Sequence, residues 1–420
     1  MTDNNKSIYL KIKKDLQIWK FSFYGFFKNL RFFEPYLYIY LLNLNFSLFH
    51  IGLLFAIRET TIYILEVPSG VFADNYGRKT SLLICFISYI ISFILFFFVA
   101  SFFLASIAMF FFGIGEAFRS GTHKSIIYSY LERKGWFDHK TFVYGRTRSF
   151  SLIGTSISAF LSIFLVLNIP SMKWIFIITI FPYILDFILI VSYPSYLNEK
   201  SGAKFSFDKF IQLTFSQLKN LFQSIKTTKI LLSSSIFDSI FKSSKDYIQP
   251  VLKNIIGAAG VYILTSYSAE ENMKIILGLT YGIFYIFNSI ASRNAYRVQK
   301  RISSYNYIYY SFYLMGIIFV LLSLLINLKI TILVIALFFI FSFIRNIRKP
   351  MIVDVFGNMV KTTQRATIHS VDSQLRSILK IFIAPALGFL SDTFSIPFAF
   401  LSFGIILLFT NIFLKIKTIQ

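Results

Sequence analysis

Long apolar stretches recur along the chain and are separated by short polar segments. Crossing a bilayer takes about 20 consecutive apolar residues in a helix. Twelve stretches reach that length, and six of them lie on each side of a polar segment near the middle of the chain. They cover roughly 22–46, 49–72, 80–100, 103–131, 147–168, 173–193, 227–256, 272–292, 305–326, 330–358, 367–390 and 396–414. The pattern predicts an all-α membrane protein with twelve transmembrane helices.

The same pattern divides the chain into five parts. They are a cytoplasmic tail at 1–21, a six-helix half at 22–193, a cytoplasmic linker at 194–226, a second six-helix half at 227–414 and a cytoplasmic tail at 415–420. Repeated six-helix halves with a substrate site near the bilayer midplane are typical of transporters. We therefore expect two pseudo-symmetric halves around a central cavity.

Composition supports the membrane assignment. The chain is 56% hydrophobic and 15% charged, whereas soluble domains are about 45–50% apolar and about 25% charged. This excludes an ordinary soluble, disordered or fibrous protein. The single cysteine, Cys85, lies in an apolar run, so a disulfide framework or a paired-cysteine metal site is excluded. We expect no metal and no cofactor.

The net charge of +23 comes from 42 basic and 19 acidic residues. In a soluble protein such an excess favours nucleic-acid binding. Here it lies mostly in alternate loops, so we expect the lipid bilayer, and no nucleic acid, as a partner. The basic loops hold Arg78, Lys79, Arg133, Lys134, Lys140, Arg146, Arg293, Arg297, Lys300, Arg301, Lys361 and Arg365, whereas the opposite side holds Lys173, Lys253, Lys274 and Lys329. Because basic loops stay inside, both termini are predicted to be cytoplasmic in a multi-pass protein of the inner membrane.

A compact motif, G-x-x-x-D-x-x-G-R-K, joins the second and third predicted spans. Gly70 would let a helix end pack closely on a neighbour, and Gly77 would permit a tight turn. Asp74 is expected at a neighbouring helix terminus or as an acceptor for Arg78. Together with Lys79, these residues form a candidate gating motif.

This motif resembles the signature of the major facilitator superfamily. The segment Gly113–Gly121 of the fourth span carries Arg119 among small residues. It is similar to the arginine-bearing fourth helix of proton-coupled members. The chain as a whole resembles bacterial drug:proton antiporters. Two features depart from that pattern: the fifth span has Gly154, Ser158 and Ser162 but lacks a Gly-Pro pair, and the loop at 293–297 keeps charge without glycines. The resemblance implies a monomer in which helices 1, 4, 7 and 10 line the cavity.

Ionisable residues inside spans are costly and are therefore functional candidates. On the implied fold, most of them lie on cavity or interface helices, and Asp186 in the sixth span is the main exception. The cavity or substrate candidates are Arg31, Arg58, Asp238, Lys242, Lys245, Arg345, Arg348, His369, Asp372 and Arg376. For some charges, simple pairing within the protein is an equal alternative; these are Arg58 with Glu59, Glu66, Asp354 and Asp392. His369 is either a packed residue or a proton relay, and His123 and Lys124 are expected to reach the membrane interface.

Glu34, Glu116 and Arg119 are the proton-coupling candidates. Burial favours the neutral form of a carboxyl group, and a nearby arginine favours the ionised form. Glu116 and Arg119 are three residues apart and can share one helix face. Either glutamate is a candidate proton carrier, with Arg119 as its switch partner.

These features predict a secondary transporter that moves a small amphiphilic molecule by alternating access, with proton-coupled efflux as the first hypothesis. Proton-coupled import of an organic anion or nutrient is the alternative. The basic bias of the candidate cavity residues makes an anionic or zwitterionic substrate as plausible as a cationic one. No nucleotide-binding loop, H-E-x-x-H helix or G-x-S-x-G turn is present in the sequence, so we expect no enzyme.

Overall fold

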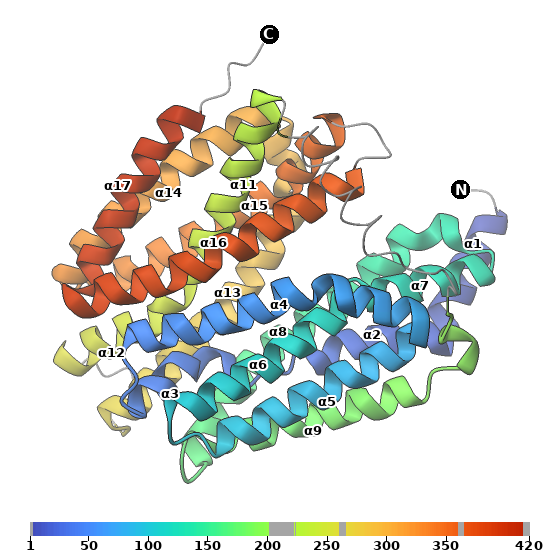
Figure 1. The fold of residues 1–420 in the computed structure, drawn as a ribbon, viewed down its shortest axis with the longest axis horizontal. Helices are drawn as coiled ribbons and strands as arrows, with labels where there is room; N and C mark the ends of the chain where they lie inside the picture. The colour runs from blue at the N-terminus through green and yellow to red at the C-terminus, as the bar shows by residue number, and fades with distance from the viewer. Residues whose placement is uncertain (1–2, 201–221, 223, 260–265, 360–364, 415–420) are drawn as a thin grey trace. The chain divides into compact units, whose positions relative to one another are not determined.

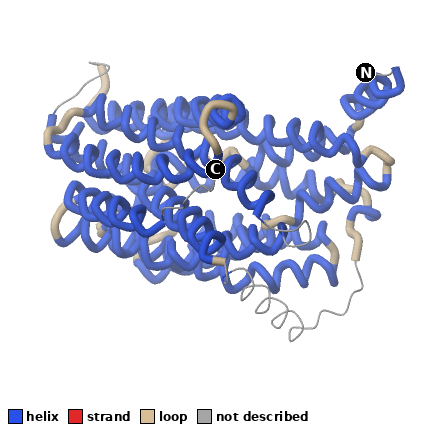
Figure 2. The backbone as a smooth tube through the Cα atoms, turned by 90° about the horizontal axis from the view of Figure 1, so that it is seen from above, coloured by secondary structure: helices blue, strands red, loops and turns tan. Residues whose placement is uncertain are grey.

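The computed structural model describes residues 3–200, 222, 224–259, 266–359 and 365–414. Within these ranges the backbone forms helices, turns and loops and no strand (Figure 2). The all-α prediction is therefore confirmed. Most of the linker predicted at 194–226, and Lys361, lie outside the described residues.

The chain folds as two compact units, which are described separately. The first unit is Met1–Pro35 with Thr61–Lys204, and the second is Tyr36–Thr60 with Phe205–Gln420. The long helix α4 (Leu48–Tyr76) contributes its first part to the second unit and the remainder to the first.

The first unit also contains three short 3₁₀ turns and seven further α-helices among its described residues. The turns are η1 (Glu34–Tyr36, which runs into the second unit), η2 (Phe137–His139) and η3 (Ser195–Leu197). The helices are α1 (Asp3–Lys14), α2 (Leu16–Lys28), α5 (Arg78–Phe97), α6 (Phe102–Arg119), α7 (Thr122–Arg133), α8 (Lys140–Asn168) and α9 (Trp174–Val191).

The described part of the second unit contains eight further α-helices and one 3₁₀ turn, η4 (Lys245–Tyr247). The helices are α3 (Leu37–Asn43), α11 (Ile225–Ser244), α12 (Ile248–Ala259), α13 (Ala269–Gln299), α14 (Ser304–Asn327), α15 (Thr331–Met359), α16 (Arg365–Thr393) and α17 (Ile396–Leu414).

Ten helical segments of the described chain are long and apolar enough to cross a membrane. They match ten of the twelve predicted spans. The prediction of a continuous helix is wrong for the other two, 22–46 and 227–256, because each is split by a 3₁₀ turn. The fourth predicted span, 103–131, is also interrupted, because α6 ends at Arg119 and α7 begins at Thr122. The turns contain charged residues, Glu34 in η1 and both Lys245 and Asp246 in η4. The first helix of each predicted half is therefore interrupted at a corresponding place.

Close helix packing in the first unit depends on small residues. Helix α5 lies beside α6 and α9, and α2 packs on α8 and α9 (Figure 1). A Cβ atom at Gly154 of α8 would lie 2.5 Å from the backbone oxygen of Phe26 in α2. Ser158 and Ser162 are buried on the same helix. The small-residue spacing of the fifth span therefore lets α2 approach α8 closely.

In the second unit, α14 lies beside α15 and α17, and α11 lies beside α16 (Figure 1). The start of α4 joins this unit through Asp392 of α16, whose carboxylate accepts the backbone N–H groups of Leu48 (3.0 Å) and Phe49 (2.6 Å). A Cβ atom at Gly52 would lie 2.5 Å from the backbone oxygen of Ala384. These interactions explain why Tyr36–Thr60 belongs to the second unit.

Candidate functional site

A shared carboxylate organises the charged interior of the first unit. Glu116, near the end of α6, accepts hydrogen bonds from Arg31 Nη2 at 2.7 Å and from Arg119 Nη2 at 2.5 Å. The hydroxyl of Tyr89 donates to Glu116 at 2.7 Å. Glu116 therefore binds two guanidinium groups and one hydroxyl, which leaves the three charged side chains with one excess positive charge.

The interruption after α2 supplies one of these guanidinium groups. Arg31 lies between α2 and η1, and its Nε donates to the hydroxyl of Tyr183 at 3.1 Å. That hydroxyl in turn donates to the backbone oxygen of Lys28 at 3.0 Å, at the last residue of α2. Breaking the helix thus frees a backbone carbonyl, which Tyr183 satisfies, and directs Arg31 to Glu116.

Glu34 lies at the start of η1, and its backbone N–H donates to the carbonyl of Arg31 at 3.1 Å. It also interacts electrostatically with Arg31. Of the predicted proton-coupling residues, Glu116 and Arg119 are in direct contact, and Glu34 lies on the same interruption as the second arginine of the cluster.

The second unit contains a similar shared carboxylate. Asp238 of α11 accepts from Arg345 Nε of α15 at 3.0 Å and from Arg376 Nη1 of α16 at 2.9 Å. Lys242, one turn further along α11, has its Nζ 3.8 Å from Asp238. Asp238 therefore joins three helices. Its single negative charge is smaller than the total positive charge of its three cationic partners.

Asp372 extends this cluster along α16. It accepts from Ser235 Oγ at 3.1 Å and pairs with Arg376 Nη2 at 3.1 Å. A cavity of about 90 Å³ is lined by Asp238, Asp372 and Arg376, and also by His369. His369 packs edge-on against Phe356, with 5.4 Å between ring centroids.

Arg348 is the most completely bonded of the cavity candidates. It is 2% exposed, and it donates to the backbone oxygens of Ile308 (2.6 Å) and Ser233 (3.0 Å). It also donates to the hydroxyls of Ser311 and Ser233, both at 2.8 Å. These bonds tie α15 to α11 and α14.

Lys245 and Arg58 also occupy ion pairs. Lys245 donates to Asp246 at 2.7 Å within the interruption between α11 and α12. In α4, Arg58 Nη2 pairs with Glu59 at 2.9 Å, and the other oxygen of Glu59 pairs with Lys380 of α16. Arg58 and Glu59 therefore pair within the protein, and Lys380 is an additional partner of Glu59.

The glycine of the gating motif forms the expected turn. Gly77 has φ +102° and precedes α5, a conformation that favours glycine. Lys79 donates to the backbone oxygens of Val191 and Tyr193, both at 2.7 Å, at the end of α9. The basic part of the motif thus fixes the start of α5 to the end of α9.

Two expectations for this motif are not met in the first unit. Arg78 donates to Ser129 Oγ of α7 at 2.7 Å instead of to Asp74, which is exposed. A Cβ atom at Gly70 would meet no described atom of its own unit within 4 Å, so the close packing expected there is not seen. In this unit the start of α5 lies close to α7, so Ser129 is within reach of Arg78. Asp74 is exposed.

The sequence profile of the Major Facilitator Superfamily matches residues 21–382. The chain belongs to the major facilitator superfamily. An uncharacterised transporter of this type from Bacillus subtilis (strain 168), YxaM, is 26% identical over 234 residues. That alignment covers 53% of this chain and 55% of the relative, so the chain spans about half of the relative's length.

Solved structures with the same fold are also transporters. The nucleoside transporter NupG has a TM-score of 0.77 and 13% identity, covering 96% of this chain and all of that chain (100%). A peptide transporter, POT, in complex with sulfate has a TM-score of 0.67 and 12% identity, covering 94% and 93%. These structures share the fold of the chain, which is a multi-pass membrane protein of the superfamily.

Several residues at or near the Glu116 cluster could not be predicted from the sequence. Tyr89 and Tyr183 touch the Glu116 cluster, but a tyrosine in an apolar run resembles any lipid-facing aromatic residue. Lys28 lies at the end of α2 and was not a candidate, because the interruption that brings it near the cluster was not predicted. Had the helix break been predicted, the polar residue beside it would have identified Lys28 as a candidate.

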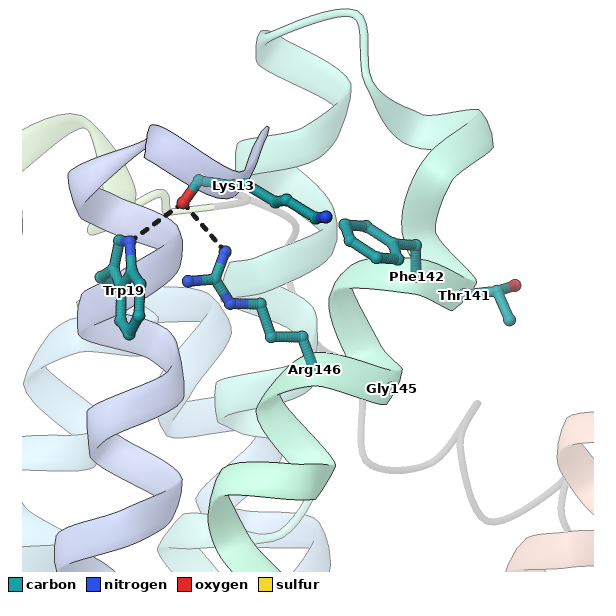
Figure 3. Close-up of a pocket in the computed structure, with 6 residues that line it drawn as sticks. All are labelled: Lys13, Trp19, Thr141, Phe142, Gly145 and Arg146. Carbon is teal, nitrogen blue, oxygen red and sulfur yellow. Dashed lines mark hydrogen bonds between the residues drawn. The ribbon is translucent and has the colours of Figure 1, made fainter. Parts of the chain in front are cut away.

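A separate cavity of about 590 Å³ is lined by residues of the N-terminal segment and of α8. The backbone oxygen of Lys13 accepts from Trp19 Nε1 at 3.0 Å and from Arg146 Nη1 at 3.2 Å (Figure 3). The guanidinium of Arg146 lies 4.1 Å from the centroid of the Trp19 ring. Arg146 is thus already engaged in anchoring the connection between α1 and α2.

Proposed function

We propose that the protein moves a small amphiphilic anion by alternating access and couples it to protons that travel with the anion. The observation that carries this proposal is the shared carboxylate. Glu116 is bound by Arg31 and Arg119, and Asp238 is bound by Arg345 and Arg376. In each unit the cations outnumber the central carboxylate, which favours a negatively charged substrate.

The same geometry favours movement of the proton in the same direction as the anion. An arginine bound to Glu116 favours its ionised form. An anion that binds Arg119 competes with Glu116 for the guanidinium, so Glu116 then takes up a proton more readily. Anion and proton therefore bind cooperatively, which is the requirement for cotransport. Import of an organic anion with protons, the alternative left open by the sequence, is the form that the geometry supports best.

Proton-coupled efflux is the second candidate function. It is supported by the resemblance of the Gly70–Lys79 motif and of Arg119 to those of drug:proton antiporters. A cationic substrate would pair with Glu116 and compete with the proton, which gives exchange in place of cotransport. Transport of lipophilic cations only would favour this function and contradict the anion proposal.

Proton movement in proteoliposomes tests both functions. Compounds are added outside liposomes that contain a pH-sensitive dye, with no pH gradient imposed. The panel includes anionic and cationic amphiphiles, and also nucleosides and peptides because two structurally similar transporters carry those names. Cotransport acidifies the lumen as the substrate enters, whereas exchange makes the lumen more alkaline.

Variants locate the proton site within this assay. We expect Glu116→Gln to abolish the substrate-dependent proton flux, and Glu34→Gln identifies any contribution of the second carboxylate. Glu132→Gln, at the exposed end of α7, is the matched control and should retain the flux. Full flux in both the Glu34→Gln and the Glu116→Gln variants would overturn the proposed coupling site.

We further propose that the protein works as a monomer in the inner membrane, with both termini in the cytoplasm. The excess of basic residues in one set of loops supports this orientation. Uptake by right-side-out vesicles, compared with export from the same vesicles after loading, distinguishes import from efflux in that membrane.

A further inference from the structure

A basic cavity of about 260 Å³ lies between α2, α7 and α8 in the first unit. Four of its lining side chains carry a cationic group, and a fifth is a histidine. They are Lys28, Arg119, His123, Lys124 and Arg148. No acidic residue is among the lining residues of the described chain. Such a wall attracts anions.

The start of α7 adds backbone donors to this wall. Helix α7 begins at Thr122, after Gly121 with φ +72°, and its N-terminus has no side-chain cap. Gly121, His123 and Lys124 line the cavity. The first N–H groups of a helix have no partner within the helix, and together with the helix dipole they bind anions. The fourth predicted span is therefore interrupted where the basic residues gather.

A buried hydroxyl group in the cavity lacks a partner. Tyr24 lines the cavity and is 4% exposed, and its hydroxyl has no hydrogen-bond partner within the described part of the chain. Its ring stacks on His123, with centroids 3.6 Å apart and planes 11° apart. Buried polar groups are nearly always hydrogen-bonded, so this hydroxyl indicates a missing acceptor.

The positive charge of the wall is only partly neutralised. Arg119 pairs with Glu116, and Lys28 interacts electrostatically with Glu116 and Asp186. Lys124 and Arg148 form no ion pair with a carboxylate in the described ranges, and both are exposed at the open side of the cavity. An anion entering from that side meets uncompensated cations first and then Arg119.

We propose that this cavity binds the carboxylate or phosphate group of the transported anion at the N-terminus of α7. The assignment rests on the proposed function, and it extends that function by defining the substrate as an organic oxyanion. At about 30 Å³ per water, the cavity has the volume of roughly nine water molecules. It thus accommodates an anionic group with a few attached atoms, within reach of the lining residue Arg119.

Inorganic phosphate is the simplest probe of this site. Thermal unfolding of the purified full-length protein in neutral detergent is followed with increasing sodium phosphate, and in parallel with sodium chloride at equal ionic strength. We expect a saturable rise in Tm with phosphate only. Equal rises with both salts would mean charge screening and would overturn the proposal.

Variants connect the rise in Tm to the cavity. Arg148→Gln should fold normally, because the side chain is exposed, and it should require at least tenfold more phosphate for half of the rise in Tm. Tyr24→Phe should weaken phosphate binding severalfold. Arg301→Gln, an exposed residue between α13 and α14, is the matched control and should respond as the wild type does. A wild-type response in Arg148→Gln would overturn the proposal.

A lipid headgroup carries the same chemistry, so a second comparison distinguishes the source of the oxyanion. Nanodiscs of phosphatidylcholine, with and without phosphatidylglycerol, are compared in the absence of phosphate. A rise in Tm that phosphatidylglycerol gives and inorganic phosphate does not would assign the cavity to lipid and overturn the substrate site. Phosphate binding without any substrate-dependent proton flux would leave the cavity standing and overturn the proposed coupling alone.

Discussion

At the scale of single residues, each unit places one carboxylate among several guanidinium or ammonium groups. Glu116 and Asp238 each accept hydrogen bonds from two arginines. Removing one partner of a buried ion pair typically costs about 3–5 kcal/mol, because the remaining charge is left unpaired. Rearranging such a cluster therefore requires a replacement charge, which under the proposed function a substrate and a proton would supply together.

Arg348 differs from the arginines that bind Glu116 and Asp238, because its donors are satisfied by serine and backbone oxygens. We expect Arg348→Met to lower the free energy of unfolding by about 3 kcal/mol, since each hydrogen bond to a charged donor contributes about 1.5–3 kcal/mol. Methionine retains a long apolar side chain over Phe237, whose ring centroid lies 4.2 Å from the guanidinium carbon. Unfolding midpoints in detergent measure the effect. Arg301→Met is the exposed control, and equal stability of the two variants would contradict the structural role.

Helix periodicity predicted contacts within a helix but not contacts between helices. The spacing of Glu116 and Arg119 indicated their pairing directly, because residues three apart share a helix face. Arg31 reaches the same carboxylate from 85 residues away in sequence. A hydropathy pattern contains no distance between spans, so the joining of Asp238 to Arg345 and Arg376 could not be derived from it.

At the scale of elements, the first helix of each predicted half is interrupted. The breaks at η1 and η4 place charged side chains in the middle of predicted spans. Interrupted helices at corresponding positions of two halves commonly mark the substrate and ion sites of transporters. The sequence predicted where these spans lie, but hydropathy averaged over a window does not detect a single 3₁₀ turn.

Close packing of α4 on α16 gives a prediction at this scale. A Cβ atom at Gly388 would overlap the backbone oxygen of Leu48, and one at Gly52 would lie 2.8 Å from Pro385 Cα. Because backbone atoms cannot rotate away, we expect Gly388→Ala to destabilise the protein by about 1–3 kcal/mol.

The matched control is Gly357→Ala in α15, where a Cβ atom would meet no described atom within 4 Å. Alanine there removes a helical glycine and should be neutral or stabilise by up to about 1 kcal/mol. Thermal unfolding of both variants in the same detergent gives the comparison. Equal midpoints for the two variants would contradict the packing argument.

At the scale of the whole molecule, the superfamily fold agrees with twelve predicted spans, although ten helical segments of the described chain are long and apolar enough to cross. The difference matters for topology, since the termini would lie on opposite sides of the membrane if only one of the two interrupted spans crossed. If the span at 227–256 failed to cross, every later loop would change sides.

Cysteine labelling tests this topology. Cys85 is fully buried, so an added cysteine should be the only thiol that a membrane-impermeant maleimide reaches in intact cells. We expect labelling from outside for Ser101→Cys and Ser395→Cys, which lie in loops between spans. Gly135→Cys and Ser303→Cys should be labelled only after the membrane is permeabilised. Outside labelling of Ser303→Cys together with protection of Ser395→Cys would show that the seventh span does not cross.

The proposed function requires that movement of an organic anion is coupled to movement of protons. The most direct measurement is accumulation of a radiolabelled anion, chosen from those that give proton flux, in proteoliposomes with an imposed pH gradient of either sign. If protons and anion move together, we expect the anion to accumulate on the more alkaline side and the accumulation to reverse with the gradient. A protonophore or Glu116→Gln should abolish the accumulation. Equilibration to equal concentrations that ignores the pH gradient would show facilitated diffusion and contradict the account.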